Sequence, residues 1–254
     1  MQKGCPLEER EAQKPSSLIV SAIFHGNAAN PPFWQQPSNA TEVFGYGTGF
    51  DHGCYACGLS SPSVLDLFIA TGAYLRGHFR LTSGLHSGEY LQCAKVLAFP
   101  RHAERLGREL ASKLKTNVRD TPVDVVISPA MGGIIIGHEV ARAFDVPALF
   151  TERDSSSNEM VLRRGFELQP GQRVIVVEDV ITTGGSTREV VTAARKAEAT
   201  VVAAGSIIDR SGGEADVGVP RVALETMKPI TYDASDCPLC RAGLPIVKPG
   251  SRKS

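Results

Sequence analysis

Hydrophobic and polar positions become regular at about residue 63 and stay so through most of the chain. Residues 63–72 begin with a serine, carry apolar side chains at helical spacing and end at Gly72, which predicts a short capped helix. Pro100 is predicted to open a second helix, because apolar side chains recur on one of its faces and charged side chains on the other.

Further along, short apolar runs alternate with helical segments. Helices are predicted to begin at residues 132–133 and near Thr187, and strands are predicted at 123–127, 148–150, 174–177, 200–208 and 221–225. Strands that alternate with helices predict an α/β fold in which a parallel sheet is covered on both faces. Ligands of such sheets bind beyond the carboxyl ends of the strands, so we expect the functional residues there.

Residues 1–61 follow neither periodicity. They contain Asn-Pro-Pro, Gln-Gln-Pro-Ser and several glycines near 45–53, a composition typical of irregular chain. The prediction is therefore an irregular, disordered extension over residues 1–61 and one α/β domain over residues 62–254.

Composition and charge narrow the class of protein. The 254 residues include 27 basic and 27 acidic side chains, and zero net charge disfavours nucleic acid as the main partner. No apolar run reaches the roughly 20 residues that a bilayer span needs, so no membrane partner is expected. Six cysteines in a chain with a sizeable core need no disulfide framework, which favours a reducing cytoplasm.

Residues 174–187 carry the strongest indication of function. Four β-branched residues, 174–177, predict a strand buried on both faces, and Glu178 and Asp179 follow at its carboxyl end. A loop of threonines, glycines and a serine then leads into a helix. Loop N–H groups and the helix dipole suit a phosphate, and the two acids are placed to bind sugar hydroxyls or a metal. The stretch therefore predicts a site for a phosphorylated sugar.

This order of parts resembles the signature with which type I phosphoribosyltransferases bind 5-phosphoribosyl 1-pyrophosphate (PRPP). It lacks the Gly-Lys-Ser/Thr of a Walker A loop and the spaced glycines of a dinucleotide-binding fingerprint. Within that family, residues 78–92 and 207–213 resemble segments of the orotate phosphoribosyltransferases, and residues 128–134 resemble their pyrophosphate loop. The resemblance covers about residues 63–250. It implies a type I phosphoribosyltransferase-like parallel sheet flanked by helices, with a small N-terminal hood.

The resemblance also implies roles for individual residues. Glu178 and Asp179 would contact the ribose hydroxyls of PRPP, and Arg210 would pair with the orotate carboxylate, a planar match that lysine could not reproduce. Thr182 would help to enclose the 5′-phosphate and would also lie near the orotate ring. The implied PRPP-binding set is Glu178, Asp179, Val180, Ile181, Thr182, Thr183, Gly184, Gly185 and Ser186.

Catalysis is assigned by the resemblance to Asp179 and Arg153. Arg153 corresponds to the basic end of a mobile loop, here residues 154–160, which in the family closes over the pyrophosphate in the neighbouring subunit's site. A homodimer with shared active sites is thereby implied.

The chain also departs from the family pattern. Gly132 and Thr82 stand where well-studied relatives carry lysines, and the loop after Arg153 lacks the lysine and histidine found in them. Positive charge for the pyrophosphate is then expected from Mg²⁺, from Arg153 and from Arg163 or Arg164.

Two Cys-x-x-Cys pairs invite a shared zinc site. Cys54–Cys57 and Cys237–Cys240 are about 180 residues apart, so we do not favour such a site and assign no protein metal ligand. The second pair is interpreted as part of a turn-rich tail. His86 could contact the substrate or could be a surface or structurally satisfied histidine, and Cys93 is expected to be a small core residue.

The resemblance implies transfer of the phosphoribosyl group of PRPP to orotate, with Mg²⁺ as cofactor, to give orotidine 5′-monophosphate and pyrophosphate in pyrimidine biosynthesis. A purine phosphoribosyltransferase on the same fold is the first alternative, but a neutral purine offers no carboxylate to Arg210. A PRPP-sensing regulatory protein is the second, and it would need a basic face or a helix-turn-helix, which the sequence does not indicate.

Overall fold

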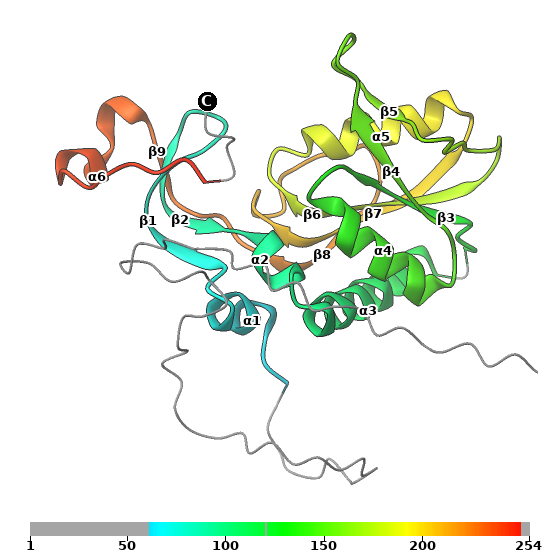
Figure 1. Ribbon diagram of the computed structural model, residues 1–254, viewed down its shortest axis with the longest axis horizontal. Helices are drawn as coiled ribbons and strands as arrows, with labels where there is room; N and C mark the ends of the chain where they lie inside the picture. Colours follow the sequence, from blue (N-terminus) through cyan, green and yellow to red (C-terminus); the bar gives the residue numbers. More distant parts are fainter. Residues whose placement is uncertain (1–60, 120, 250–254) are drawn as a thin grey trace, which may run out of the picture. The chain divides into compact units, whose positions relative to one another are not determined.

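The computed structural model describes residues 61–119 and 121–249 (Figure 1). The predicted extension, apart from Ser61, and the Cys54–Cys57 pair lie outside the described residues. Two sheets organise the described chain, one of six strands and one of three.

The larger sheet has the strand order β5-β4-β3-β6-β7-β8. All neighbouring pairs are parallel except β4 and β5, which are antiparallel. Every predicted strand is present, although β3 lies two residues farther toward the carboxyl end than predicted, and β4 and β6 run farther toward their carboxyl ends than the apolar pattern indicated. The strands are β3 (Val125–Pro129), β4 (Ala148–Arg153), β5 (Met160–Leu162), β6 (Arg173–Ile181), β7 (Thr200–Asp209) and β8 (Arg221–Thr226).

Helices cover both faces of this sheet, as Figure 1 shows. The long α3 (Pro100–Val118) and α4 (Gly133–Phe144) pack on one face, and α5 (Gly185–Lys196) packs on the other. Residues 174–177 of β6 are fully buried, and they alternate between the two hydrophobic clusters. The prediction of a strand buried on both faces is therefore confirmed, because successive side chains of a strand point to opposite faces.

Local signals in the sequence set the helix boundaries. In α1 (Val64–Ala70), Ser63 and Asp66 form a reciprocal capping box, and Gly72 takes a positive φ of 61° just after the helix. Pro100 occupies the first turn of α3, as predicted. Helix α5 begins two residues before the expected Thr187, because Gly184 provides a left-handed N-cap with φ 74°.

The smaller sheet, called the hood below, consists of β1 (Tyr74–Arg80), β2 (His86–Leu91) and β9 (Thr231–Tyr232) in the order β1-β2-β9. The short α2 (Cys93–Leu97) follows β2, and buried Cys93 lies at its start, as expected for a core residue. After β9 come a 3-10 helix (Ala234–Asp236) and α6 (Pro238–Arg241). The hood thus contains C-terminal chain as well as the N-terminal hairpin, which the sequence analysis did not anticipate.

Residues 242–249, called the C-terminal segment below, return to the outer edge of β1. The Val247 N–H donates to the carbonyl of His78 at 2.8 Å, and the Arg80 N–H donates to the carbonyl of Val247 at 2.9 Å. These two hydrogen bonds hold Val247 on β1 and so fix where the next two residues, Lys248 and Pro249, lie.

Candidate active site

A cleft of about 600 Å³ lies at the carboxyl end of β6, between the loop that leads into α5 and the hood. The loop side is contributed by Glu178, Val180 and residues 182–186, called the phosphate loop below. The opposite side is contributed by residues 80–83, Tyr90, Arg210 and two residues of the C-terminal segment, Lys248 and Pro249. One continuous sequence therefore forms one wall, and four separate segments form the other.

All five residues of the phosphate loop line the cleft. Gly184 is left-handed, and a Cβ added there would lie only 2.8 Å from a methyl carbon of Val217, so the turn requires glycine. Arg188 of α5 donates from its Nη1 atom to the carbonyl of Thr183 at 2.9 Å and also to the carbonyl of Asp216. The loop is thus fixed at the amino end of α5, where N–H groups and the helix dipole favour an anion.

The two adjacent acids face different neighbours. Glu178 lines the cleft and accepts a hydrogen bond from the hydroxyl of buried Thr187. Asp179 points to the other side of β6, where its Oδ1 atom accepts the N–H of Val180 at 2.9 Å. Neighbouring strand residues alternate in direction, so the two side chains leave opposite faces of β6. The backbone of β6 therefore separates the two carboxylates.

Burial gives Glu178 an unusual protonation equilibrium. Loss of solvent raises the pKa of its carboxyl from 4.5 to about 7, although the hydrogen bond from Thr187 acts in the opposite direction. Burial likewise raises the pKa of Asp179 above its usual value, against the hydrogen bond from the Val180 N–H. Perturbed carboxyls inside a cleft are a recognised indication of a functional site.

Asp179 lies against the loop between β3 and α4. A Cβ added at Gly132 would be 2.6 Å from Oδ1 and 2.7 Å from Oδ2 of Asp179. Any side chain at position 132 would therefore displace the carboxylate. This contact gives a physical reason for the glycine at position 132, which the sequence analysis noted as a departure from the lysine of the family pattern.

Arg210 is a half-buried cation that lines the cleft. It follows β7, and its N–H donates to the carbonyl of Ile181 at 2.8 Å, which joins the carboxyl ends of β6 and β7. Its guanidinium carbon lies 5.8 Å from the centre of the Tyr90 ring. The Nε atom is buried without a hydrogen-bond partner among the described residues. Burial lowers the pKa of this arginine, but an arginine remains charged at neutral pH.

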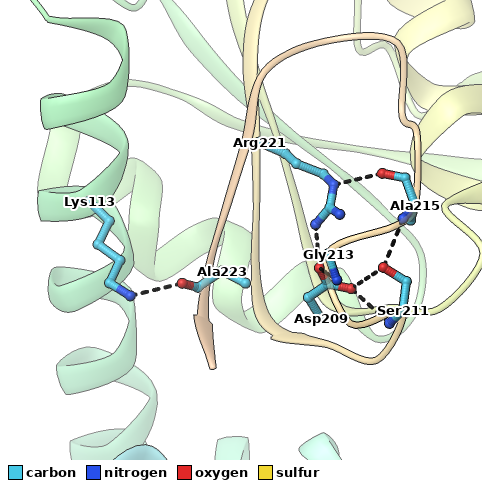
Figure 2. Close-up of polar contacts among 7 residues, drawn as sticks. All are labelled: Lys113, Asp209, Ser211, Gly213, Ala215, Arg221 and Ala223. Atoms are coloured by element: carbon cyan, nitrogen blue, oxygen red, sulfur yellow. Dashed lines mark hydrogen bonds and ion pairs between the residues drawn. The ribbon is translucent and has the colours of Figure 1, made fainter. Parts of the chain in front are cut away.

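A network around Asp209 holds the loop that carries Arg210 (Figure 2). Oδ1 of this fully buried aspartate accepts the N–H and the hydroxyl of Ser211, at 2.8 and 2.6 Å, and Oδ2 accepts the Gly213 N–H at 3.1 Å. Arg221 of β8 donates to Oδ2 at 2.5 Å and to the carbonyl of Ala215 at 2.7 Å. Burial alone would raise the pKa of Asp209, but the hydrogen bonds from Ser211 and Arg221 outweigh it and lower the pKa.

Lys113 extends this support to the neighbouring strand. Its Nζ atom donates to the carbonyl of Ala223 at 2.9 Å (Figure 2). It also donates to the carbonyl of Leu224 at 3.2 Å, so Lys113 attaches α3 to β8. The strand that supplies Arg221, β8, is therefore held by its pairing with β7 and by the hydrogen bonds from α3.

Arg153 does not line the cleft within one chain. It ends β4, pairs with Glu189 Oε2 at 2.8 Å and donates to the carbonyl of Asn158. It lines a separate hollow of about 430 Å³, which shares Gly185 and Glu189 with the cleft. Residues 154–159 form a turn closed by a 2.8 Å bond from the Asp154 N–H to the Glu159 carbonyl.

Other predicted residues differ in how they reach the site. Ile181 belongs to the core, so only its backbone faces neighbouring loops. Arg164 makes a 2.8 Å ion pair with Glu152 and does not line the cleft. His86 is buried and does not line the cleft. This agrees with the alternative that His86 is a structurally satisfied histidine.

Arg80 and Lys248 line the cleft and were missed by the sequence analysis. Arg80 lies within residues 78–92, so its segment, though not its side chain, was identified. Nothing in the local sequence marked Lys248, since its position depends on the pairing of Val247 with β1.

Comparison with known proteins gives a consistent result. The family described as the phosphoribosyl transferase domain matches residues 99–227. An orotate phosphoribosyltransferase of Pelotomaculum thermopropionicum is 53% identical over 195 residues, which cover 77% of this chain and 100% of that protein. One of Desulforamulus reducens is 50% identical over 195 residues, which cover 77% of this chain and 99% of that protein.

Solved structures show the same fold. The crystal structure of orotate phosphoribosyltransferase from Aeropyrum pernix superposes with a TM-score of 0.52 at 26% identity, and it covers 64% of this chain and 93% of its own. None of the described helices is long and apolar enough to cross a membrane.

Proposed function

The chain belongs to the orotate phosphoribosyltransferase family, and from this premise we propose how its cleft transfers the phosphoribosyl group of PRPP to orotate. The C1–pyrophosphate bond of PRPP breaks, N1 of orotate forms the new bond to C1 after losing its proton, and pyrophosphate leaves. The products are orotidine 5′-monophosphate and pyrophosphate. Residues 62–254 constitute the catalytic domain in this proposal.

The observation that carries the proposal is the position of Arg210. Its side chain lines the same cleft as the phosphate loop, its guanidinium lies beside the Tyr90 ring, and its buried Nε has no partner among the described residues. A buried donor without a partner is costly, and a planar carboxylate at this point would relieve that cost with charge-assisted bonds. Orotate carries such a carboxylate, whereas adenine, guanine and hypoxanthine do not.

Each wall of the cleft then has a separate task. The phosphate loop and the amino end of α5 bind the 5′-phosphate, and the carboxylate of Glu178 accepts hydrogen bonds from the ribose hydroxyls. Arg210 orients the orotate ring so that N1 faces C1 of the sugar. Positioning two reactants in this way lowers the barrier without any covalent intermediate on the protein.

Asp179 is proposed to act from the other side of β6. Its carboxylate contacts the position of Gly132, in the loop that the family resemblance assigns to pyrophosphate. We propose that it fixes this loop and a part of the sugar at the same time. In this proposal the two acids act at different places. Glu178 acts inside the cleft, and Asp179 acts next to Gly132 in the pyrophosphate loop.

Magnesium suits this arrangement. Glu178 provides a carboxylate inside the cleft, and Mg²⁺ prefers one or two carboxylates together with substrate phosphate oxygens. When bound, the ion would neutralise charge on the departing pyrophosphate. In this proposal Glu178 would hold the ion together with phosphate oxygens of PRPP.

Arg153 is proposed to serve the neighbouring subunit of a homodimer. It does not line the cleft of its own chain, and it lies on the hairpin of β4 and β5 at the edge of the sheet. A residue at such an edge can reach a second active site when two subunits associate.

A cytoplasmic location remains a prediction from cysteine usage.

The proposal is tested by supplying the purified protein with PRPP and Mg²⁺ and with orotate, adenine, hypoxanthine or guanine in turn. Formation of orotidine 5′-monophosphate with orotate alone is expected. Turnover of a purine in place of orotate would establish the purine enzyme instead. PRPP binding without turnover of any base would establish the regulatory alternative.

A further inference from the structure

Four potential metal ligands meet on the hood, away from the residues that line the cleft. They are His78 of β1, His86 of β2, Cys237 just before α6 and Cys240 within α6. We propose that these side chains bind a structural zinc ion in a Cys₂His₂ site. Among the described residues this is the group of histidine, cysteine or acidic side chains that could hold a metal ion.

The distances between the ligand atoms match a tetrahedral zinc site. The sulfur of Cys237 lies 3.6 Å from His78 Nε2, and the sulfur of Cys240 lies 3.7 Å from the same nitrogen and 3.3 Å from His86 Nδ1. Zinc bonds of about 2.3 Å to sulfur and about 2.05 Å to nitrogen place such atoms roughly 3.5 Å apart in a tetrahedron. All four atoms lie within 4.8 Å of one another, so one ion can reach them all.

The two imidazole nitrogens are 2.9 Å apart, somewhat closer than the roughly 3.3 Å that a tetrahedral ion would set. Binding would therefore require the rings to separate by a few tenths of an ångström. Without an ion, the same contact would be an ordinary hydrogen bond between the rings. The experiment below distinguishes these two states.

The surroundings of His78 prepare it for a metal. Its Nδ1 atom lies 2.8 Å from the carbonyl of Leu244. Because a carbonyl only accepts, Nδ1 carries the proton, and Nε2 presents its lone pair to the cluster. A hydrogen bond of this kind behind a metal-binding histidine is the usual arrangement in zinc sites.

Ligand type and burial favour zinc in a structural role. Two thiolates and two imidazoles are the ligands of structural zinc sites, and four protein ligands leave no position for a substrate. His78, His86 and Cys237 are buried, while Cys240 is exposed at the surface of the hood. The exposed ligand gives the ion an entry path.

Zinc at this point would join parts of the chain that are far apart in sequence. It would attach α6 to the β1–β2 hairpin, and the hydrogen bond that His78 Nδ1 donates to the Leu244 carbonyl would extend the attachment into the C-terminal segment. Three residues later Val247 pairs with β1, and Lys248 and Pro249 line the cleft. If the cleft acts as proposed above, the ion would therefore help to fix the positions of Lys248 and Pro249 in the active site without contacting the substrate.

The first experiment is metal analysis of the full chain, purified under reducing conditions without a histidine tag. One zinc per chain is expected. Cys240→Ser should lose the ion, and Cys240→His, which restores a ligand, should retain it. Two controls remove other thiols: Cys93→Ala, and Cys54→Ser combined with Cys57→Ser, should both keep one zinc.

The second experiment replaces zinc with Co²⁺. Tetrahedral coordination with two thiolates should give visible d–d bands and a near-ultraviolet thiolate charge-transfer band, and Cys240→Ser, which should not hold the ion, should lose these bands. Removal of the ion should also accelerate hydrogen exchange in peptides that contain Val247, whose N–H bonds to β1.

A wild-type chain that contains no zinc and gives no tetrahedral Co²⁺ spectrum would overturn the proposal. Loss of the ion in the Cys54/Cys57 variant with retention in Cys240→Ser would also overturn it. Neither measurement depends on turnover, so failure of the zinc site and failure of the proposed function remain distinguishable.

Discussion

The two walls of the cleft are built in different ways. The phosphate side is one uninterrupted segment, residues 178–186, in which β6 ends, a left-handed glycine turns the chain and α5 begins. The base side combines residues 80–83, Tyr90, Arg210 and Lys248, which come from distant parts of the sequence. The phosphate side therefore depends on local backbone geometry, and the base side depends on tertiary contacts.

This difference has a functional consequence. A phosphate is recognised by N–H groups and a helix end that any correctly folded loop can supply. Discrimination among bases requires one charged side chain held in a fixed place, because a carboxylate must meet a guanidinium in its plane. Changes on one wall should thus affect one substrate more than the other.

The largest effect is expected when the support of Arg210 is removed. Asp209→Asn takes a charge from the buried ion pair with Arg221, and loss of one partner of such a pair costs about 3 kcal/mol or more of unfolding free energy. Glu214→Gln is the matched control, because its ion pair with Lys228 is exposed and should contribute less than about 1 kcal/mol. Denaturant unfolding measures both, and equal losses would contradict the structural role of Asp209.

Arg210→Ala should show the clearest difference between the effects on orotate and on PRPP. Loss of the charge-assisted bonds to the carboxylate is expected to lower kcat/KM for orotate by roughly 100-fold, or about 3 kcal/mol, with little change in the KM for PRPP. Arg210→Lys should recover little, because an ammonium cannot form the paired bonds. Exposed Arg101→Ala should leave both constants unchanged. Equal losses for both substrates with Arg210→Ala would show that it does not bind the base.

Gly132→Ala tests the phosphate side. The added Cβ would lie 2.6 Å from Oδ1 of Asp179, so the carboxylate or the loop must move. We expect about a tenfold loss of kcat/KM for PRPP, because small misplacements of reacting groups are costly. Gly88→Ala, in the hood, is the control, since its nearest neighbours would be 3.9 Å away. Steady-state kinetics with each substrate varied decide the matter.

The smallest effect is a shift in pH dependence. If the Glu178 carboxylate accepts hydrogen bonds from ribose, kcat/KM for PRPP should fall below about pH 7, the pKa of this group. Thr187→Val removes the hydrogen bond that lowers the pKa, so the acid limb should move to higher pH. Glu178→Gln should remove the limb. A limb unchanged in Thr187→Val would exclude Glu178 as its source.

The free energy of unfolding should also depend on the protonation of Glu178. The unfolded Glu178 loses its proton near pH 4.5 and the folded one near pH 7, so between these values the folded chain holds more protons. Stability must then fall as pH rises through this window. Glu178→Gln should therefore gain stability relative to the wild type at pH 8 and should gain little near pH 4.5.

Much of the fold and of the phosphate side was predictable because the signals are local. Residues 174–177 are apolar on both sides, Gly184 is needed for the turn, and Ser63 and Pro100 begin helices through contacts within one turn. One difference in the strand bounds arose where polar residues, Glu178 and Asp179, continue β6, which pairs through its backbone with β7. Apolar periodicity does not record such pairing.

The sequence by itself determined the family resemblance, the parallel sheet and the phosphate loop, since each depends on the order of residues within a short segment. The tertiary structure alone decided that Glu178 and Asp179 face opposite sides of β6, and that Lys248 lines the cleft. It also brought Cys237 and Cys240 to His78 and His86, across a separation of more than 150 residues. Contacts of that range follow from how sheets and loops pack, which sequence spacing does not encode.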